Sequence, residues 1–202
     1  MALATYSELV STVESYLART DLTSIIPTFV QLAQDRMTRD LRTREMLKIV
    51  TTTATDSTVE LPSDFLEMRE LHFQGNPPIT LRYESPDKFF RDCLTTTSGL
   101  PYYYTIIGYE FQFAPAPDSS MTLQMLYYAK PTYISSTTAS NVYLANYSDA
   151  LLYATLAEAE PYLMNDPRIQ TWASMYDRAI TNIMNSDIGK KFPNTAINVT
   201  LG

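Results

Sequence analysis

The sequence predicts an α+β fold in which a four-helix bundle carries an inserted β-rich region and ends in an extended carboxy-terminal tail. Two observations support this prediction. Apolar residues recur at helical spacing towards both ends of the chain, whereas the middle is rich in β-branched residues and turn signals. We therefore assign residues 1–45 and 148–189 to a bundle of two helical hairpins, 46–147 to the insertion and 190–202 to the tail.

The first predicted helix begins with a capping box, in which Thr5 is the N-cap and Glu8 follows three residues later. Helical spacing of apolar residues continues to about Ala18. After a polar break, a second helix has Pro27 near its first turn, where the missing N–H does little harm. Its apolar residues share one stripe as far as Leu41, so the two segments predict a helical hairpin.

The middle of the chain has the pattern of strands. Residues 46–61 surround a polar turn and predict one hairpin, and residues 67–83 predict a second around the turn QGNPP. Residues 85–94 start with Ser-Pro and predict a short helix. Two further strands turn at Gly108, and a last strand occupies about 121–130.

Helices return after an irregular connection rich in Thr and Ser. Ser148 is the predicted cap of a helix that Pro161 kinks or ends near its last turn. Asp166 and Pro167 then begin the most clearly amphipathic helix of the chain, which is expected to end near Gly189. These two helices complete the predicted bundle.

Composition excludes several classes of protein. Fifteen Lys and Arg against 22 Asp and Glu give a net charge of −7, which a general nucleic-acid-binding protein would not have. The single cysteine excludes an intramolecular disulfide and a cysteine-rich metal site. No apolar run is long enough to span a bilayer, and no signal-peptide pattern is present, so we expect no membrane association and synthesis in a cytoplasm.

No known catalytic, metal-binding or cofactor-binding motif occurs, and we expect neither enzyme activity nor a cofactor. His72 is the only histidine and lies in a predicted strand, while Cys93 has no activating neighbours. Glu158 and Glu160 are two residues apart on a helix, so they point to different sides instead of converging on one bond. Glycine-rich phosphate-binding loops are absent as well.

An arginine cluster contrasts with this acidic chain. Arg36, Arg39, Arg42 and Arg44 fall within nine residues. Acidic residues are interleaved with them, which makes a DNA-tracking face the least favoured of three interpretations. The other two are a solvated helix face with local ion pairs and a protein–protein contact in which arginine pairs with carboxylates.

Four stretches of the sequence, in series, resemble the podovirus-type head-to-tail adaptor proteins of tailed bacteriophages. Together they cover about residues 4–185, and they begin ATYSELVSTV, LPSDFLEMRE, GLPYYYTIIG and LLYATLAEAE. The resemblance implies a helical bundle with a β-rich extension, assembled as a ring, usually of twelve subunits, below the portal. It further implies a virion protein without enzyme activity, which docks a downstream tail or nozzle protein and extends the channel for DNA without binding it specifically.

Two surfaces are candidate sites within such an assembly. The arginine cluster is assigned to an inter-subunit or portal interface. The tail matches no part of the family pattern, but its apolar residues alternate with polar ones, as in a strand with one apolar face. We predict that it adds as a strand to a sheet of a partner, the portal, through Phe192, Ile197, Val199 and Leu201. A frayed chain end without a role is the alternative.

Two other functions are open to the sequence. The tyrosine-rich strands at 102–113 and 127–128 suggest a glycan-binding or receptor-binding tail component, and scattered carboxylates suggest, more weakly, a cell-wall hydrolase. Strand alternation argues against the first, because Phe111 and Phe113 share one face, as a core requires.

Overall fold

A computed structural model describes residues 3–19, 21–163 and 167–191 of the chain. The chain divides into two units. We call residues 1–46 and 131–202 the helical unit and residues 47–130 the β unit. The division predicted from the sequence, into residues 1–45 with 148–189, residues 46–147 and residues 190–202, remains a prediction.

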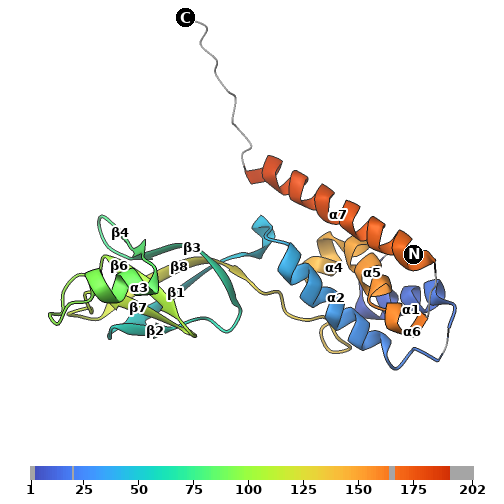
Figure 1. The fold of residues 1–202 in the computed structure, drawn as a ribbon, viewed down its shortest axis with the longest axis horizontal. Helices are drawn as coiled ribbons and strands as arrows, with labels where there is room; N and C mark the ends of the chain where they lie inside the picture. The colour runs from blue at the N-terminus through green and yellow to red at the C-terminus, as the bar shows by residue number, and fades with distance from the viewer. Residues whose placement is uncertain (1–2, 20, 164–166, 192–202) are drawn as a thin grey trace, which may run out of the picture. The chain divides into compact units, whose positions relative to one another are not determined.

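The described part of the helical unit contains six α-helices and one short 3-10 turn (Figure 1). Their bounds are α1 (Tyr6–Leu17), α2 (Ile26–Asp40), η1 (Arg44–Met46), α4 (Val142–Asn146), α5 (Ser148–Ala157), α6 (Glu160–Leu163) and α7 (Arg168–Lys191).

Helix α1 begins with the predicted capping box. The Glu8 backbone N–H donates to Thr5 Oγ1 at 3.3 Å, and the Thr5 N–H donates to Glu8 Oε2 at 3.0 Å. The helix ends at Leu17, and Ala18 takes a left-handed conformation with φ of 51°. Helix α2 carries Pro27 in its first turn, as predicted. The local signals at both helix starts are therefore confirmed.

Helix α5 lies at the centre of the helical unit, where it packs against α1, α2, α4 and α7 (Figure 1). Seven of its ten residues are buried, so the helix has no polar side along its length. In a four-helix bundle each helix keeps an outward polar face. The predicted four-helix bundle is therefore wrong: within a mixed α+β fold, the other helices surround one buried helix.

Two signals around α5 also act differently from the prediction. Tyr147 occupies the N-cap position without a side-chain bond, and Ser148 is the first helical residue instead of the cap. The helix already ends at Ala157, and Pro161 lies within the separate short helix α6. The predicted cap at Asp166 falls outside the described residues.

The β unit consists of two four-stranded sheets. In the first the order is β1-β8-β3-β4, and in the second it is β2-β7-β6-β5. Neighbours are antiparallel except for β5 and β6, which are parallel. The bounds are β1 (Leu47–Ala54), β2 (Thr58–Glu60), β3 (Phe65–Phe73), β4 (Ile79–Thr80), β5 (Arg82–Tyr83), β6 (Tyr103–Ile107), β7 (Glu110–Ala114) and β8 (Met121–Ala129).

The two sheets share one apolar core, so the β unit is a two-layer sandwich. Phe73 on β3 of the first sheet lies against Phe113 on β7 of the second, with ring centroids 5.6 Å apart. Phe65 contacts both Phe111 and Tyr127 in the same core. Phe111 and Phe113 face inward together, as their alternation predicted.

The predicted hairpin over residues 46–61 is wrong. The two strands flank the expected turn, but β1 pairs with β8 and β2 pairs with β7 in the opposite sheet. A run of β-branched residues favours a strand without specifying its partner, because pairing depends on distant neighbours and on burial. Strands β1 and β2 therefore diverge after the turn at residues 55–57 and enter different layers.

The other local predictions in the β unit hold. Strands β3 and β4 pair around the QGNPP turn, and β6 and β7 form a hairpin at Gly108, whose φ is +60°. The predicted short helix is α3 (Pro86–Lys88), which continues as the π-helical turn η2 (Phe89–Cys93).

The two ends of the β unit lie side by side. Leu47, the first residue of β1, is paired with Tyr128 near the end of β8. The chain therefore enters and leaves the β unit on neighbouring antiparallel strands.

Candidate functional site

The four arginines of the predicted interface have different surroundings, and Arg36 is the most enclosed of them. Its guanidinium lies 3.6 Å from Oε1 of Glu158, the residue directly after α5. It also lies 4.0 Å from a carboxylate oxygen of Asp40 and 4.0 Å from one of Asp177. Its Cζ lies 4.3 Å from the centroid of the Tyr176 ring. Only 29% of the Arg36 side chain is exposed, so these contacts connect α2 with α5 and α7 inside the helical unit.

Tyr176 completes this cluster. Its hydroxyl donates a hydrogen bond of 2.6 Å to Asp40 Oδ2. Burial and, to a lesser degree, this bond raise the pKa of Tyr176 above its usual range, because both disfavour the phenolate. The buried ring, the carboxylate and the cation of Arg36 therefore satisfy one another.

Arg42 and Arg44 also make contacts within the helical unit. Arg42 Nη1 donates to the carbonyl oxygens of Thr38 and Leu41, each at 2.6 Å, at the carboxy end of α2. The Arg44 backbone N–H donates to Oδ1 of the buried Asp187 at 3.0 Å. These residues fix the end of α2 and the turn η1 that precedes the β unit.

Arg39 differs from the other three. It lies in the last turn of α2, and its side chain is exposed. Its guanidinium pairs with no carboxylate or carbonyl of residues 3–19, 21–163 and 167–191. Of the four, Arg39 is thus the residue whose charge remains available to another molecule. The second predicted surface, formed by Phe192, Ile197, Val199 and Leu201, lies outside the described residues.

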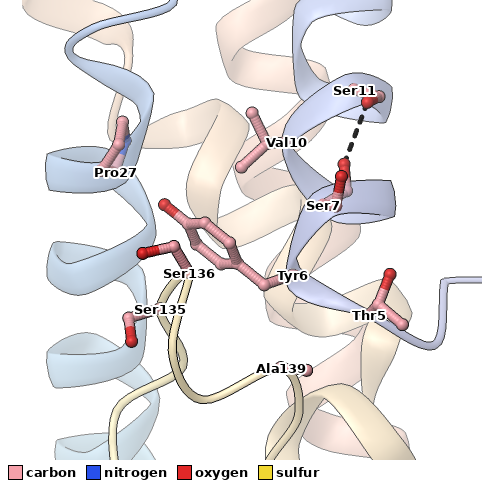
Figure 2. Close-up of a pocket in the computed structure, with 9 residues that line it drawn as sticks. All are labelled: Thr5, Tyr6, Ser7, Val10, Ser11, Pro27, Ser135, Ser136 and Ala139. Atoms are coloured by element: carbon pink, nitrogen blue, oxygen red, sulfur yellow. Dashed lines mark hydrogen bonds between the residues drawn. The ribbon is translucent and has the colours of Figure 1, made fainter.

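A pocket of about 600 Å³ lies between the start of α1, the start of α2 and the loop after β8 (Figure 2). Hydroxyl groups line much of it, but several are already bonded within the protein. Ser11 Oγ donates to the Ser7 carbonyl oxygen at 2.9 Å, and Thr5 Oγ1 caps α1. Burial raises the pKa of Tyr6, which keeps that phenol neutral and unsuited to act as a base. The pocket has no acid–base pair in its described lining.

The residues weighed as catalytic candidates have structural surroundings. His72 on β3 has its Nδ1 3.4 Å from Glu70 Oε1, and Cys93 is buried in a small apolar cluster. Glu158 is held by Arg36. Over the residues that the structure describes, no three His, Cys, Asp or Glu side chains gather in a way that would hold a metal ion. None of the helices in those ranges combines the length and the apolar character of a membrane span.

The sequence reasoning missed one surface, the free edge of β1. This strand ends the first sheet, and a groove of about 480 Å³ separates it from β2. Because the sequence predicted that β1 pairs with β2, this edge was expected to be occupied. A usable signal was present in the uncharged, proline-free run IVTTTA, which a protected edge strand would not show.

Comparison with known proteins relates the whole described chain to one family. A family model described as SU10 adaptor protein matches residues 4–196. The match runs through the first part of the helical unit, all of the β unit and the remaining helices. No curated protein matches the chain.

Proposed function

The chain belongs to the SU10 adaptor protein family, a bacteriophage adaptor family, and from this we propose that it forms a ring between the portal and the tail of a phage particle. The family is one of structural proteins and makes this chain a component of the virion. The observation that carries the proposal is the extent of the match, because 4–196 includes both units instead of one shared domain.

The proposed ring contains twelve copies and extends the DNA channel of the portal. A downstream tail or nozzle protein docks below it, and the genome passes through its lumen during packaging and ejection. A net charge of −7 on each copy supports passage without retention, since like charges on protein and phosphate repel each other. No enzyme activity is part of this role.

Arg39 is our candidate for a contact between copies or with the portal. The reason is its exposed guanidinium without a partner in the described chain, at the end of a helix where Arg36 and the following Arg42 are both engaged. Arg36, Arg42 and Arg44 support that contact indirectly, because they fix the helix end that presents Arg39. The carboxy-terminal segment remains a second proposed docking element.

Electron microscopy tests the proposal directly. The purified protein, alone and mixed with its portal, is expected to give rings in negative stain, and a cryo-EM reconstruction of the neck of the particle should place twelve copies below the portal. A protein that stays monomeric with the portal, and density at the neck that does not fit its two units, would overturn the proposal. A positive zymogram on host cell wall would instead support a hydrolase.

A charge reversal tests the Arg39 contact within the same assay. Arg39→Glu is expected to reduce the yield of rings and leave the fold intact, because an exposed charge contributes at most about 1 kcal/mol to stability. Arg91→Glu is the matched control, since Arg91 is 73% exposed on the β unit and, among the described residues, pairs with the adjacent Asp92 alone. Equal ring yields for the two variants would remove Arg39 from the interface.

A further inference from the structure

Strand β1 leaves one side of its backbone unpaired. It is an eight-residue strand at the end of its sheet, and β8 is its one neighbour. Its residues make no backbone hydrogen bond outside that ladder within the described chain. A regular edge of this length is a template for the addition of another strand.

The register shows which groups face the free side. The Gln74 N–H donates to the Thr122 carbonyl, so Thr122 on β8 directs its backbone groups towards β3. Because backbone groups of successive residues alternate between the two neighbouring strands, the even-numbered residues of β8 bond to β3 and the odd-numbered ones to β1. The β1 partners of those odd-numbered residues include Val50 and Thr52. The odd-numbered residues of β1, which include Ile49, Thr51 and Thr53, therefore present their N–H and C=O groups to the open edge.

A groove beside this edge exposes the inner layer of the sandwich. Because β1 and β2 diverge into different sheets, a space of about 480 Å³ remains between them. Its apolar lining comes from both sheets and includes Val50, Val59, Leu61 and Met125. A strand added to β1 would place every second side chain over these residues, since side chains alternate between the two faces of a strand.

The edge also lacks the usual protection against pairing. The one charge on β1 is that of Lys48, and its Nζ is bound to Asp64 Oδ2 at 2.6 Å. From Ile49 to Ala54 there is no charged residue and no proline, and 62% of Ile49 is exposed. Proteins normally blunt such edges with charges, prolines or bulges, so an open edge of this kind indicates an occupant.

We propose that β1 accepts residues 195–201 of a second copy as an added strand; the inference rests on the proposed ring, which brings copies together. The seven residues TAINVTL are one residue shorter than the eight-residue strand β1 and carry no charge. Ile197, Val199 and Leu201 share one face of a strand and would cover the groove, while Asn198 and Thr200 face solvent. The recipient sheet is then another copy of the chain instead of the portal.

Hydrogen exchange on the full chain measures whether the edge is occupied. In assembled protein the segment 47–54 is expected to exchange its outward amides about tenfold more slowly than in a variant with Ile197, Val199 and Leu201 changed to Ser, since paired amides exchange only on opening. The control changes Asn198 and Thr200 to Ser and should keep the protection, because those side chains face away from the groove. Equal exchange in all three proteins overturns the proposal.

A backbone variant tests the recipient. Thr51→Pro removes an outward N–H and leaves the ladder to β8 in place, whereas Thr51→Ala keeps the N–H. The proline variant should release the segment 195–201 to rapid exchange, and the alanine variant should not. If Thr51→Pro unfolds the β unit, the tail variants above still decide the matter, because they alter no described residue.

Cross-linking identifies which molecule supplies the strand. In a Cys93→Ala background, copies with Thr51→Cys are mixed with copies with Asn198→Cys and treated with a short bis-maleimide. A product that joins the two kinds of copy is expected. The absence of that product from the assembled protein overturns the proposal. Negative stain of the same samples tests the ring separately. Rings without the cross-linked product would contradict the strand addition but not the ring. The cross-linked product without rings would support the strand addition but not the ring.

Discussion

Arg36 and Arg39 lie less than one turn apart on α2, yet the protein uses their charges differently. Arg36 is enclosed by three carboxylates and the Tyr176 ring, whereas Arg39 is exposed. Sequence spacing alone cannot separate them, because the difference arises from α7, more than 130 residues further along the chain. The pair therefore provides an internal comparison between a stabilising arginine and one that is available for recognition.

We expect Arg36→Ala to lower the free energy of unfolding by about 1–2 kcal/mol, since it removes a cation–π contact and leaves several carboxylates without their cation. Arg39→Ala should change it by less than about 0.5 kcal/mol. Urea unfolding followed by circular dichroism measures both. Equal effects of the two substitutions would contradict the assignment of Arg36 to the interior contacts.

Asp64 gives the β unit a defined pH dependence. Burial would raise the pKa of this carboxyl, but hydrogen bonds from Lys48 Nζ at 2.6 Å and from Tyr127 OH at 2.7 Å outweigh it and lower the pKa below 3.8. Because the pKa is lower in the folded than in the unfolded protein, the contribution is present above the ordinary value and is lost as the pH falls through the folded value.

Asp64→Asn is accordingly expected to reduce the free energy of unfolding by about 1–2 kcal/mol at pH 7, through the loss of hydrogen bonds to a charged group. The difference from the unmodified protein should shrink at pH 3 and below. Urea titrations at the two pH values test this. A difference that is the same at both would show that the carboxylate charge plays no part.

At the scale of the elements, helix starts show how far a local signal determines structure. The Thr5 box forms as its sequence predicts, because its two partners lie within four residues of each other. Ser148 is also a favoured cap residue, but it becomes the first residue of α5, directly after α4. Packing of the buried helix α5, and not the cap residue, sets that start.

Alanine substitutions compare these two positions. Thr5→Ala should lower the free energy of unfolding by about 1 kcal/mol through loss of the cap. Ser148→Ala should be neutral or slightly stabilising, because Ala has the higher helix propensity and no cap bond is lost. Thermal and urea unfolding measure both. A loss at Ser148 as large as that at Thr5 would mean that its hydroxyl does act as a cap.

The elements that could be predicted are those specified by neighbouring residues. Thr5, Pro27 and Gly108 mark their helix starts and turn correctly, because capping and φ preferences act over a few residues. The pairing of β1 with β8 joins residues 67 to 81 positions apart, and no local pattern encodes it. The central place of α5 did leave a signal, the absence of any polar side in ALLYATLA, which a bundle helix would not show.

The same distinction between local and long-range signals applies to the candidate site. The sequence identifies the arginine cluster as unusual, but it cannot show that Arg36 and Arg42 are engaged within the helical unit, since their partners come from other helices or from backbone carbonyls. The run IVTTTA shows that β1 lacks the charges and prolines of a protected edge, but it could not show that β1 is an edge strand. An edge exists only by virtue of the strand order in a sheet, and that order depends on long-range pairing.

At the scale of the whole molecule, the β unit has the properties of an independent domain. It has its own core, and its first and last strands are paired at Leu47 and Tyr128. We expect residues 47–130, expressed alone, to unfold cooperatively in urea. Phe73→Ala is the control and should abolish the transition, since removal of a fully buried phenylalanine costs about 3–5 kcal/mol. A fragment without a cooperative transition would show that the unit depends on the helices.

The charge of the whole chain leads to one more prediction. With a net charge of −7, the free protein should not retard duplex DNA in a gel at moderate ionic strength, and added salt should have no effect. Tight binding that weakens steeply with salt would contradict the passage of DNA without retention and would indicate a cationic surface that binds phosphates.

The pairing of Leu47 with Tyr128 also determines how the β unit would respond to tension. A pull transmitted through its two ends would separate β1 from β8 like a zip, one hydrogen-bonded pair at a time, because both ends lie at the same end of an antiparallel ladder. Pulled in shear, the same ladder would have to lose its bonds together. The β unit is therefore expected to open at a lower force when it is pulled through its two ends than when β1 and β8 are pulled in shear.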